Sequence, residues 1–204
     1  DLHSFPTRRS SDLNRSGFSC SGNGANLTAL DLSQNTLLTE LGCSSNRLTA
    51  LDLSQNTQLI LVDCSSNRLT TLDLSHNTHL ELFLCYGNQF NTSALDDIFC
   101  SLHDRTGDTN GYIVPLKDSS DPNHATVLAT NKQNATAKNW KVQYYSGSAD
   151  IPATTGTYTC PQLNMSRYIT LTVKNGEAIK LDFMAAAAGT QRFRSEERRV
   201  GKEC

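Results

Sequence analysis

The sequence lacks the features that identify most enzymes and membrane proteins. It has no run of about 18 apolar residues, so it contains no candidate transmembrane helix. The motifs G-x-S-x-G and H-E-x-x-H and the P-loop are absent, and no Ser/His/Asp, Cys/His or paired-carboxylate arrangement stands out. We therefore expect a chain that is not an enzyme, holds no cofactor and spans no membrane.

An excess of positive charge is also absent, with 18 Lys and Arg against 20 Asp and Glu. Two Arg-rich segments, His3–Leu13 and Arg194–Cys204, can be encoded by opposite strands of one oligonucleotide that resembles a sequencing adapter. We interpret residues 1–13 and 194–204 as adapter-derived, which makes the chain a metagenomic fragment, and exclude them from the fold. The remainder is weakly acidic and has no basic patch, so nucleic acid is not an expected partner.

The middle of the chain carries an internal repeat of 21 residues. The segment Leu30-Asp-Leu-Ser-Gln-Asn-Thr36 recurs from Leu51 and, with one change, from Leu72. Between these copies, the segment Cys43-Ser-Ser-Asn46 recurs at the same spacing from Cys64 and, as Cys-Tyr-Gly-Asn, from Cys85. A fixed period of this length predicts a solenoid in which each repeat contacts its neighbours.

The repeat predicts rows of buried side chains, because apolar residues alternate in both half-units as they do on one side of an extended segment. The rows are Leu30/Leu51/Leu72, Leu32/Leu53/Leu74, Leu41/Val62/Phe83 and Cys43/Cys64/Cys85. Zinc sites usually contain closely spaced cysteine pairs, and these are absent. We interpret the cysteines as small core residues, with metal or redox chemistry and cross-repeat disulfides as the alternatives.

Asparagine recurs where each half-unit must turn. The positions are Asn35, Asn56 and Asn77 in one register and Asn46, Asn67 and Asn88 in the other. An Asn side chain can hydrogen-bond the backbone nearby or in the next repeat. We therefore expect structural Asn ladders, and a ligand-binding role is the alternative.

The two half-units, LxxLxCxxNx and LxxLDLxxNxx, resemble the nested 21-residue class of leucine-rich repeats, which is common in surface and secreted proteins of Bacteroidetes-type bacteria. The resemblance covers Phe18 to Phe90, and Phe18–Asn23 is similar to one further Cys half-unit. It implies a β-rich leucine-rich-repeat solenoid over residues 14–90 and an extracellular or cell-surface location. It brings no catalytic residues with it.

Residues 91–160 resemble the region that follows such repeats, and we expect a small α/β C-terminal cap there. The expected elements are a helix over 93–102 with Ser93 as N-cap, a loop over 104–111, a strand over 112–115, a helix over 121–132 and a strand over 140–145. The first helix would cover the open end of the repeats. Residues 161–193 would begin a truncated β-rich module, with a trailing hairpin over 168–184 around Asn175-Gly176.

Cys100 and Cys160 lie outside the cysteine register and within the predicted cap. In an exported domain two such cysteines suggest a disulfide, and two free thiols are the alternative.

Two sets of residues are candidates for binding. Leu61, Leu82, Leu84 and Tyr86 would form an outward apolar patch, which is either an interface or a surface that the cap covers. Asp31, Asp52 and Asp73 would form a row of like charges, which either holds a cation or bonds nearby hydroxyl groups and water.

These observations favour a non-enzymatic module that binds another protein, such as a host or cell-surface protein. A carbohydrate- or cell-wall-binding module is one alternative, and it would need exposed aromatic side chains on one face, where the repeats offer Tyr86. A spacer or targeting segment of a larger exported enzyme is another.

Overall fold

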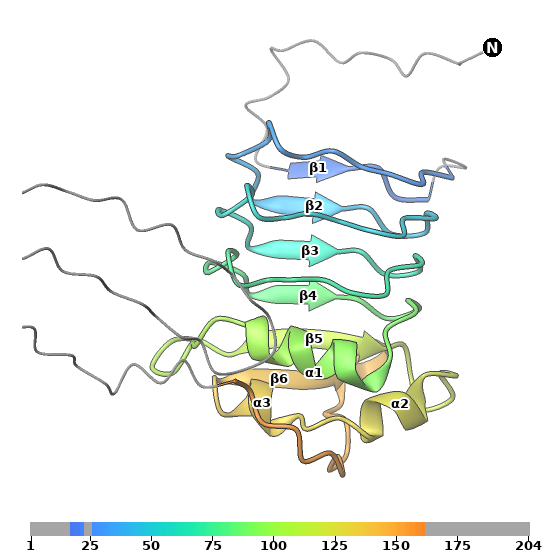
Figure 1. Ribbon diagram of the computed structural model, residues 1–204, viewed down its shortest axis with the longest axis vertical. Coiled ribbons are helices and arrows are strands. Elements are labelled where there is room, and N and C mark those ends of the chain that lie inside the picture. The colour runs from blue at the N-terminus through green and yellow to red at the C-terminus, as the bar shows by residue number, and fades with distance from the viewer. Residues whose placement is uncertain (1–16, 23–25, 162–204) are drawn as a thin grey trace, which may run out of the picture. The chain divides into compact units, whose positions relative to one another are not determined.

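The computed structural model describes residues 17–22 and 26–161 (Figure 1). They form one sheet of six parallel strands, whose order in the sheet follows their order in the chain. The strands are β1 (Gly17–Ser19), β2 (Glu40–Gly42), β3 (Leu61–Asp63), β4 (Leu82–Leu84), β5 (Gly111–Leu116) and β6 (Trp140–Tyr144). The hairpin expected over 168–184 lies outside the described residues.

The pairing of β2, β3 and β4 follows the sequence repeat. Leu41 pairs with Val62, and Val62 pairs with Phe83, so each step is 21 residues. All three side chains are fully buried. Ile113 of β5 and Val142 of β6 continue the same buried row. The Cys half-units therefore supply the strands of the repeats.

The other half of each repeat is not the extended strand that the alternation predicts. Residues 51–53 and 72–74 belong to no strand, although Leu53 and Leu74 are buried as expected. Each segment ends in a turn, in which Asn56 N–H donates to the Leu53 carbonyl oxygen and Asn77 N–H donates to the Leu74 carbonyl oxygen, both at 3.0 Å.

Asparagine side chains connect neighbouring repeats in this half. The Asn77 amide donates to the carbonyl oxygens of Leu53 and Asn56, at 3.1 and 3.0 Å. One repeat earlier, Asn56 donates in the same way to Leu32 and Asn35. These bonds satisfy buried backbone groups that a strand ladder would otherwise satisfy.

Helix α1 (Thr92–Ser101) follows the last repeat. Its N-cap is Asn91, whose side chain accepts a hydrogen bond from Ala94 N–H at 2.8 Å. The prediction of Ser93 as N-cap was wrong, because Asn91 is extended and can reach this N–H while Ser93 already lies inside the helix.

Residues 91–160 extend the sheet beyond the last repeat (Figure 1), and α1 packs against that repeat, where Leu74 N–H donates to Ser101 Oγ at 3.2 Å. Leu82 pairs with Tyr112 and Tyr112 pairs with Lys141, steps of 30 and 29 residues. The steps exceed 21 residues because helices occupy the connections. The helix expected over 121–132 is the shorter α2 (His124–Leu128). A second short helix, α3 (Gln133–Thr136), begins just after that range, and a 3-10 turn, η2 (Ser146–Ser148), follows β6.

The three α-helices pack on the inward side of the sheet. Their buried residues Ile98, Phe99, Val127 and Ala135 join the same core cluster as Leu41 and Val62. The opposite side of the sheet is therefore free of α1, α2 and α3. No helix in the described part of the chain combines the length and hydrophobicity that a bilayer span requires.

Candidate functional site

The outward side of the sheet gathers side chains from six strands, because alternate residues of each strand point away from the core. One row is Gly17, Glu40, Leu61, Leu82, Tyr112 and Lys141. The second row is Ser19, Gly42, Asp63, Leu84 and Val114. We call these two rows, together with Tyr86 and Tyr145, the sheet face.

The structure places the predicted apolar patch in the centre of the sheet face. Leu61, Leu82 and Leu84 are half-buried. Tyr112 lies beside Leu82 in register, and Val114 lies beside Leu84. Residues after the repeats therefore enlarge the patch sideways along the sheet.

Tyr145 covers one part of the sheet face. Its ring lies 5.0 Å from the ring of Tyr86, measured between centroids, with an angle of 38° between the planes. Tyr86 follows β4 and Tyr145 follows β6, so this contact crosses over β5. Val114 on β5 is only 5% exposed, whereas Tyr145 is 52% exposed. The outward-facing Val114 is therefore buried, while the Tyr145 ring stays exposed.

Tyr112 and Lys141 are members of the sheet face that sequence reasoning missed. Tyr112 is 36% exposed, and the Lys141 ammonium lies 6.0 Å from the centroid of its ring. The strand over 112–115 was predicted, but its pairing with β4 was not. The signal lay in Tyr112-Ile113-Val114, whose alternation matches Leu82-Phe83-Leu84.

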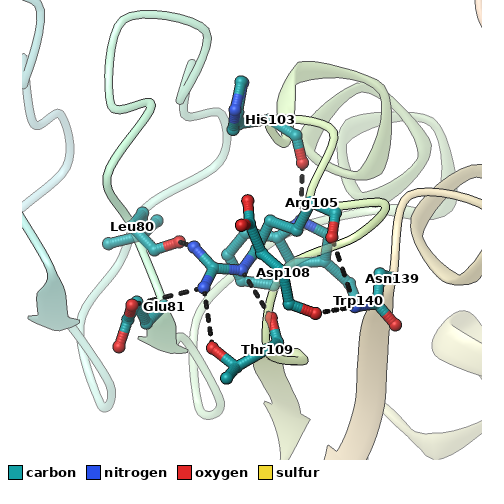
Figure 2. Close-up of polar contacts among 8 residues, drawn as sticks. All are labelled: Leu80, Glu81, His103, Arg105, Asp108, Thr109, Asn139 and Trp140. Atoms are coloured by element: carbon teal, nitrogen blue, oxygen red, sulfur yellow. Dashed lines mark hydrogen bonds and ion pairs between the residues drawn. The ribbon is translucent and has the colours of Figure 1, made fainter.

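Arg105 holds β5 in register with the repeats (Figure 2). Its buried guanidinium donates to the carbonyl oxygens of Leu80 and Thr109, both at 3.1 Å, and pairs with the Glu81 carboxylate at 3.2 Å. The sequence suggested only a polar loop here. The guanidinium joins the last repeat to the β4–β5 connection and so positions Tyr112 beside Leu82.

Trp140 of β6 packs against the connection between β4 and β5. Its indole N–H donates to the His103 carbonyl oxygen at 2.8 Å, and the ring is 1% exposed (Figure 2). A Cβ atom on Gly111 would lie 2.6 Å from this ring. Gly111 is therefore required for the close approach of β5 and β6, which sets Lys141 beside Tyr112.

Asn67 shows how the Asn ladder of the Cys half-units spaces the repeats. Its Oδ1 accepts the Leu48 N–H at 3.0 Å, and its amide donates to the carbonyl oxygens of Cys43 and Cys64 at 3.0 Å each. Asn46 and Asn88 make equivalent bonds in their own repeats. The contacts of these residues are with the backbone of the protein itself.

The cysteine row lies inside the core. Cys43, Cys64 and Cys85 are buried free thiols, and Cys20 is half-buried. Burial raises the pKa of Cys43 to about 12 and raises the pKa of Cys64 well above its usual value. These thiols are protonated and poorly reactive at neutral pH. Among the described residues no group of three or more His, Cys, Asp or Glu is arranged to hold a metal ion.

Asp31, Asp52 and Asp73 lie in the other half of the repeat, away from the sheet face. Each carboxylate accepts the N–H of the serine two residues later, at 2.9–3.0 Å. These bonds lower the pKa of Asp31 and Asp52. The carboxylates are exposed and stabilise local turns.

A disulfide joins Cys100 at the end of α1 to Cys160, with 5.3 Å between the Cα atoms. The segment that leads to Cys160 runs against the helices: Gly156 N–H donates to the Thr130 carbonyl oxygen at 3.0 Å, and Tyr158 O–H donates to Asp97 at 3.2 Å. A Cβ on Gly156 would lie 2.3 Å from the Ala129 carbonyl oxygen. The disulfide and Gly156 together hold residues 155–160 against the inward helices.

No family model and no curated protein matches the chain. Among solved structures, the functional domain of InlJ from Listeria monocytogenes, described as including a cysteine ladder, is similar with 33% sequence identity and a TM-score of 0.41. The match covers 52% of this chain and 21% of that chain, so about half of this chain corresponds to about a fifth of that one.

Proposed function

We propose that this chain is a protein-binding module, built on a leucine-rich-repeat solenoid with a C-terminal extension, and that it binds its partner through the sheet face. The observation that carries this proposal is the register of β3, β4 and β5. It places Leu61, Leu82 and Tyr112 side by side on the side of the sheet that the helices leave free. Solenoids commonly use such extended surfaces for binding.

The composition of the sheet face favours a protein over a carbohydrate. Exposed Tyr112 and Tyr145 add to the aromatic surface that Tyr86 offered alone in the repeats. However, Tyr86 and Tyr145 pack on each other at 38°, and leucines supply the rest of the patch. Clustered apolar and aromatic side chains are typical of protein interfaces.

We propose that the chain is part of an exported protein. The disulfide between Cys100 and Cys160 is of the kind that persists in oxidising compartments. We therefore propose a surface or secreted bacterial protein, whose partner is a host or cell-surface protein.

Parallel screening of the folded chain against a cell-surface protein library and a glycan array tests the proposal. We expect protein ligands whose binding is lost in Leu82→Asp and Tyr112→Asp. Leu37→Asp is the matched control, because Leu37 is 65% exposed and lies outside the strands. Thermal melting shows whether each variant folds.

Three results would count against this function. One is binding to glycans alone. Another is protein binding that survives both sheet-face substitutions. The third is Leu82→Asp with unchanged binding and unchanged thermal stability.

A further inference from the structure

The sheet face has its charges at its two ends and its apolar side chains between them. Glu40 on β2 and Asp63 on β3 lie at one end, and Lys141 on β6 lies at the other. Leu61, Leu82 and Tyr112 fill the space between Glu40 and Lys141 in a single row, while Asp63 lies one row away. The sheet face therefore has an apolar centre, a negatively charged end and a positively charged end.

A further acidic side chain nearby is already paired. Glu81 precedes β4, and its carboxylate forms an ion pair with Arg105 at 3.2 Å. Asp63 accepts hydrogen bonds from Ser65 N–H and O–H, which hold its carboxylate in place without neutralising it. The negative end is thus formed by Glu40 and Asp63.

The positive end is also held in place. Lys141 pairs with Tyr112 in the sheet, and its ammonium lies 6.0 Å from the centroid of the tyrosine ring. An ammonium near an aromatic face is attracted to it. A ligand that packs on Tyr112 would therefore meet this charge.

From this arrangement we infer that the sheet face binds a protein segment with an apolar centre, a basic end over β2 and β3, and an acidic end over β6. The inference rests on the proposed function. β2 and β6 are four strands apart, which corresponds to about 19 Å. An extended segment of about six residues or a helix of about 13 residues spans this length.

Complementary charges at the rim of an interface set orientation and association rate more than affinity. The apolar centre supplies most of the affinity, and the charges fix which end of the segment lies over β2. Removal of one end charge should weaken binding by about two- to fivefold.

Random 16-residue peptides displayed on phage provide the probe for the folded full chain. We expect selected peptides to carry Lys or Arg at one end, apolar residues in the middle and Asp or Glu at the other. Their binding should weaken by about two- to fivefold in Asp63→Asn and in Glu40→Gln, and further with added salt.

Asp73→Asn is the matched control, because Asp73 also accepts bonds from the N–H and O–H of the serine two residues later but lies away from the sheet face. Asn can accept the same backbone bond in both variants, so the charge is the main difference. Reversing the charge of Lys141 gives a more specific test than removing a charge. Lys141→Glu should weaken a selected peptide, and replacing the acidic end of that peptide with Lys should restore its binding.

The outcomes separate the two proposals. Peptides that need Leu82 but show no charge asymmetry and no response to the charge variants would overturn the inference and leave the proposed function standing. Failure to select any peptide whose binding depends on Leu82 would also overturn the inference, and the protein-library screen would then decide the proposed function by itself.

Discussion

Tyr86 and Tyr145 pack against each other across strand β5, with their ring centroids 5.0 Å apart. One residue comes from the last repeat and the other from the end of the sheet. Their contact joins the repeats to the segment that follows them, on the outward side of the sheet. Arg105 joins the same two parts just before β4, through its bonds to Leu80 and Glu81.

This pairing should be measurable in a double-mutant cycle. We expect Tyr86→Ala and Tyr145→Ala to show a coupling free energy of about 1 kcal/mol, as packed aromatic pairs do. Urea unfolding of both single variants and the double variant gives the value. Additive effects would show that the rings contribute independently and that the contact does not join the two parts.

Asn67→Ala should destabilise the protein by about 2–4 kcal/mol. The substitution leaves the buried Leu48 N–H without its acceptor and removes one of the two amide donors to the Cys43 carbonyl oxygen, which keeps its bond from Asn46. Arg68→Ala is the control, because the neighbouring Arg68 is exposed and surface changes usually stay within about 0.5 kcal/mol. Equal midpoints in urea for the two variants would contradict a structural role for the Asn ladder.

The turns after β3 and β4 have equivalent positions, Ser66 and Gly87, at which we expect substitutions to change stability in opposite directions. Ser66 and Gly87 both adopt left-handed backbone conformations, with φ of 54° and 67°. Gly87→Ala should destabilise by about 1 kcal/mol, because a side chain is strained there and its Cβ would lie 3.3 Å from the Ser66 backbone. Ser66→Gly should be neutral or stabilising. Thermal unfolding of both variants tests the pair, and the reverse order of stabilities would refute it.

The buried thiols predict a loss of stability at alkaline pH. The pKa of Cys43 is about 12 in the folded protein and about 9 as the reference value, so the folded state retains the proton longer. The contribution of Cys43 is fully present below pH 9 and should fall by about 1.4 kcal/mol per pH unit between pH 9 and 12, and Cys64 and Cys85 add falls of the same sign. Unfolding free energies for the protein and for Cys43→Ala, measured across this range, should show a shallower fall in the variant. Identical slopes would exclude this thiol as a cause.

The repeat region was largely predictable because its chemistry recurs. The 21-residue spacing placed Leu41, Val62 and Phe83 in one buried row, and the pairing of β2, β3 and β4 has this spacing. The strand expected in the Leu-Asp-Leu segments was wrong, because the alternation of buried leucines there does not reveal that Asn77 bends the chain and bonds the neighbouring repeat.

After residue 91 the sequence does not repeat, so single helices and strands could be predicted there but not which of them pack together. A helix was recognised near 93–102, but its cap was assigned to Ser93 instead of Asn91. The alternation of Tyr112-Ile113-Val114 matches that of β4, but no fixed spacing indicated that β5 and β6 would join the same sheet, or that Arg105 of the β4–β5 connection would be buried. Tyr112 and Lys141 were therefore absent from the predicted patch.

The sequence by itself determined which residues of the repeats are buried and which of them are neighbours, because a fixed period forces equivalent residues into rows. Only the tertiary structure decided where the sheet face ends. That boundary depends on contacts between residues far apart in the chain, such as Arg105 with Leu80 and Trp140 with His103, and their spacing follows no period.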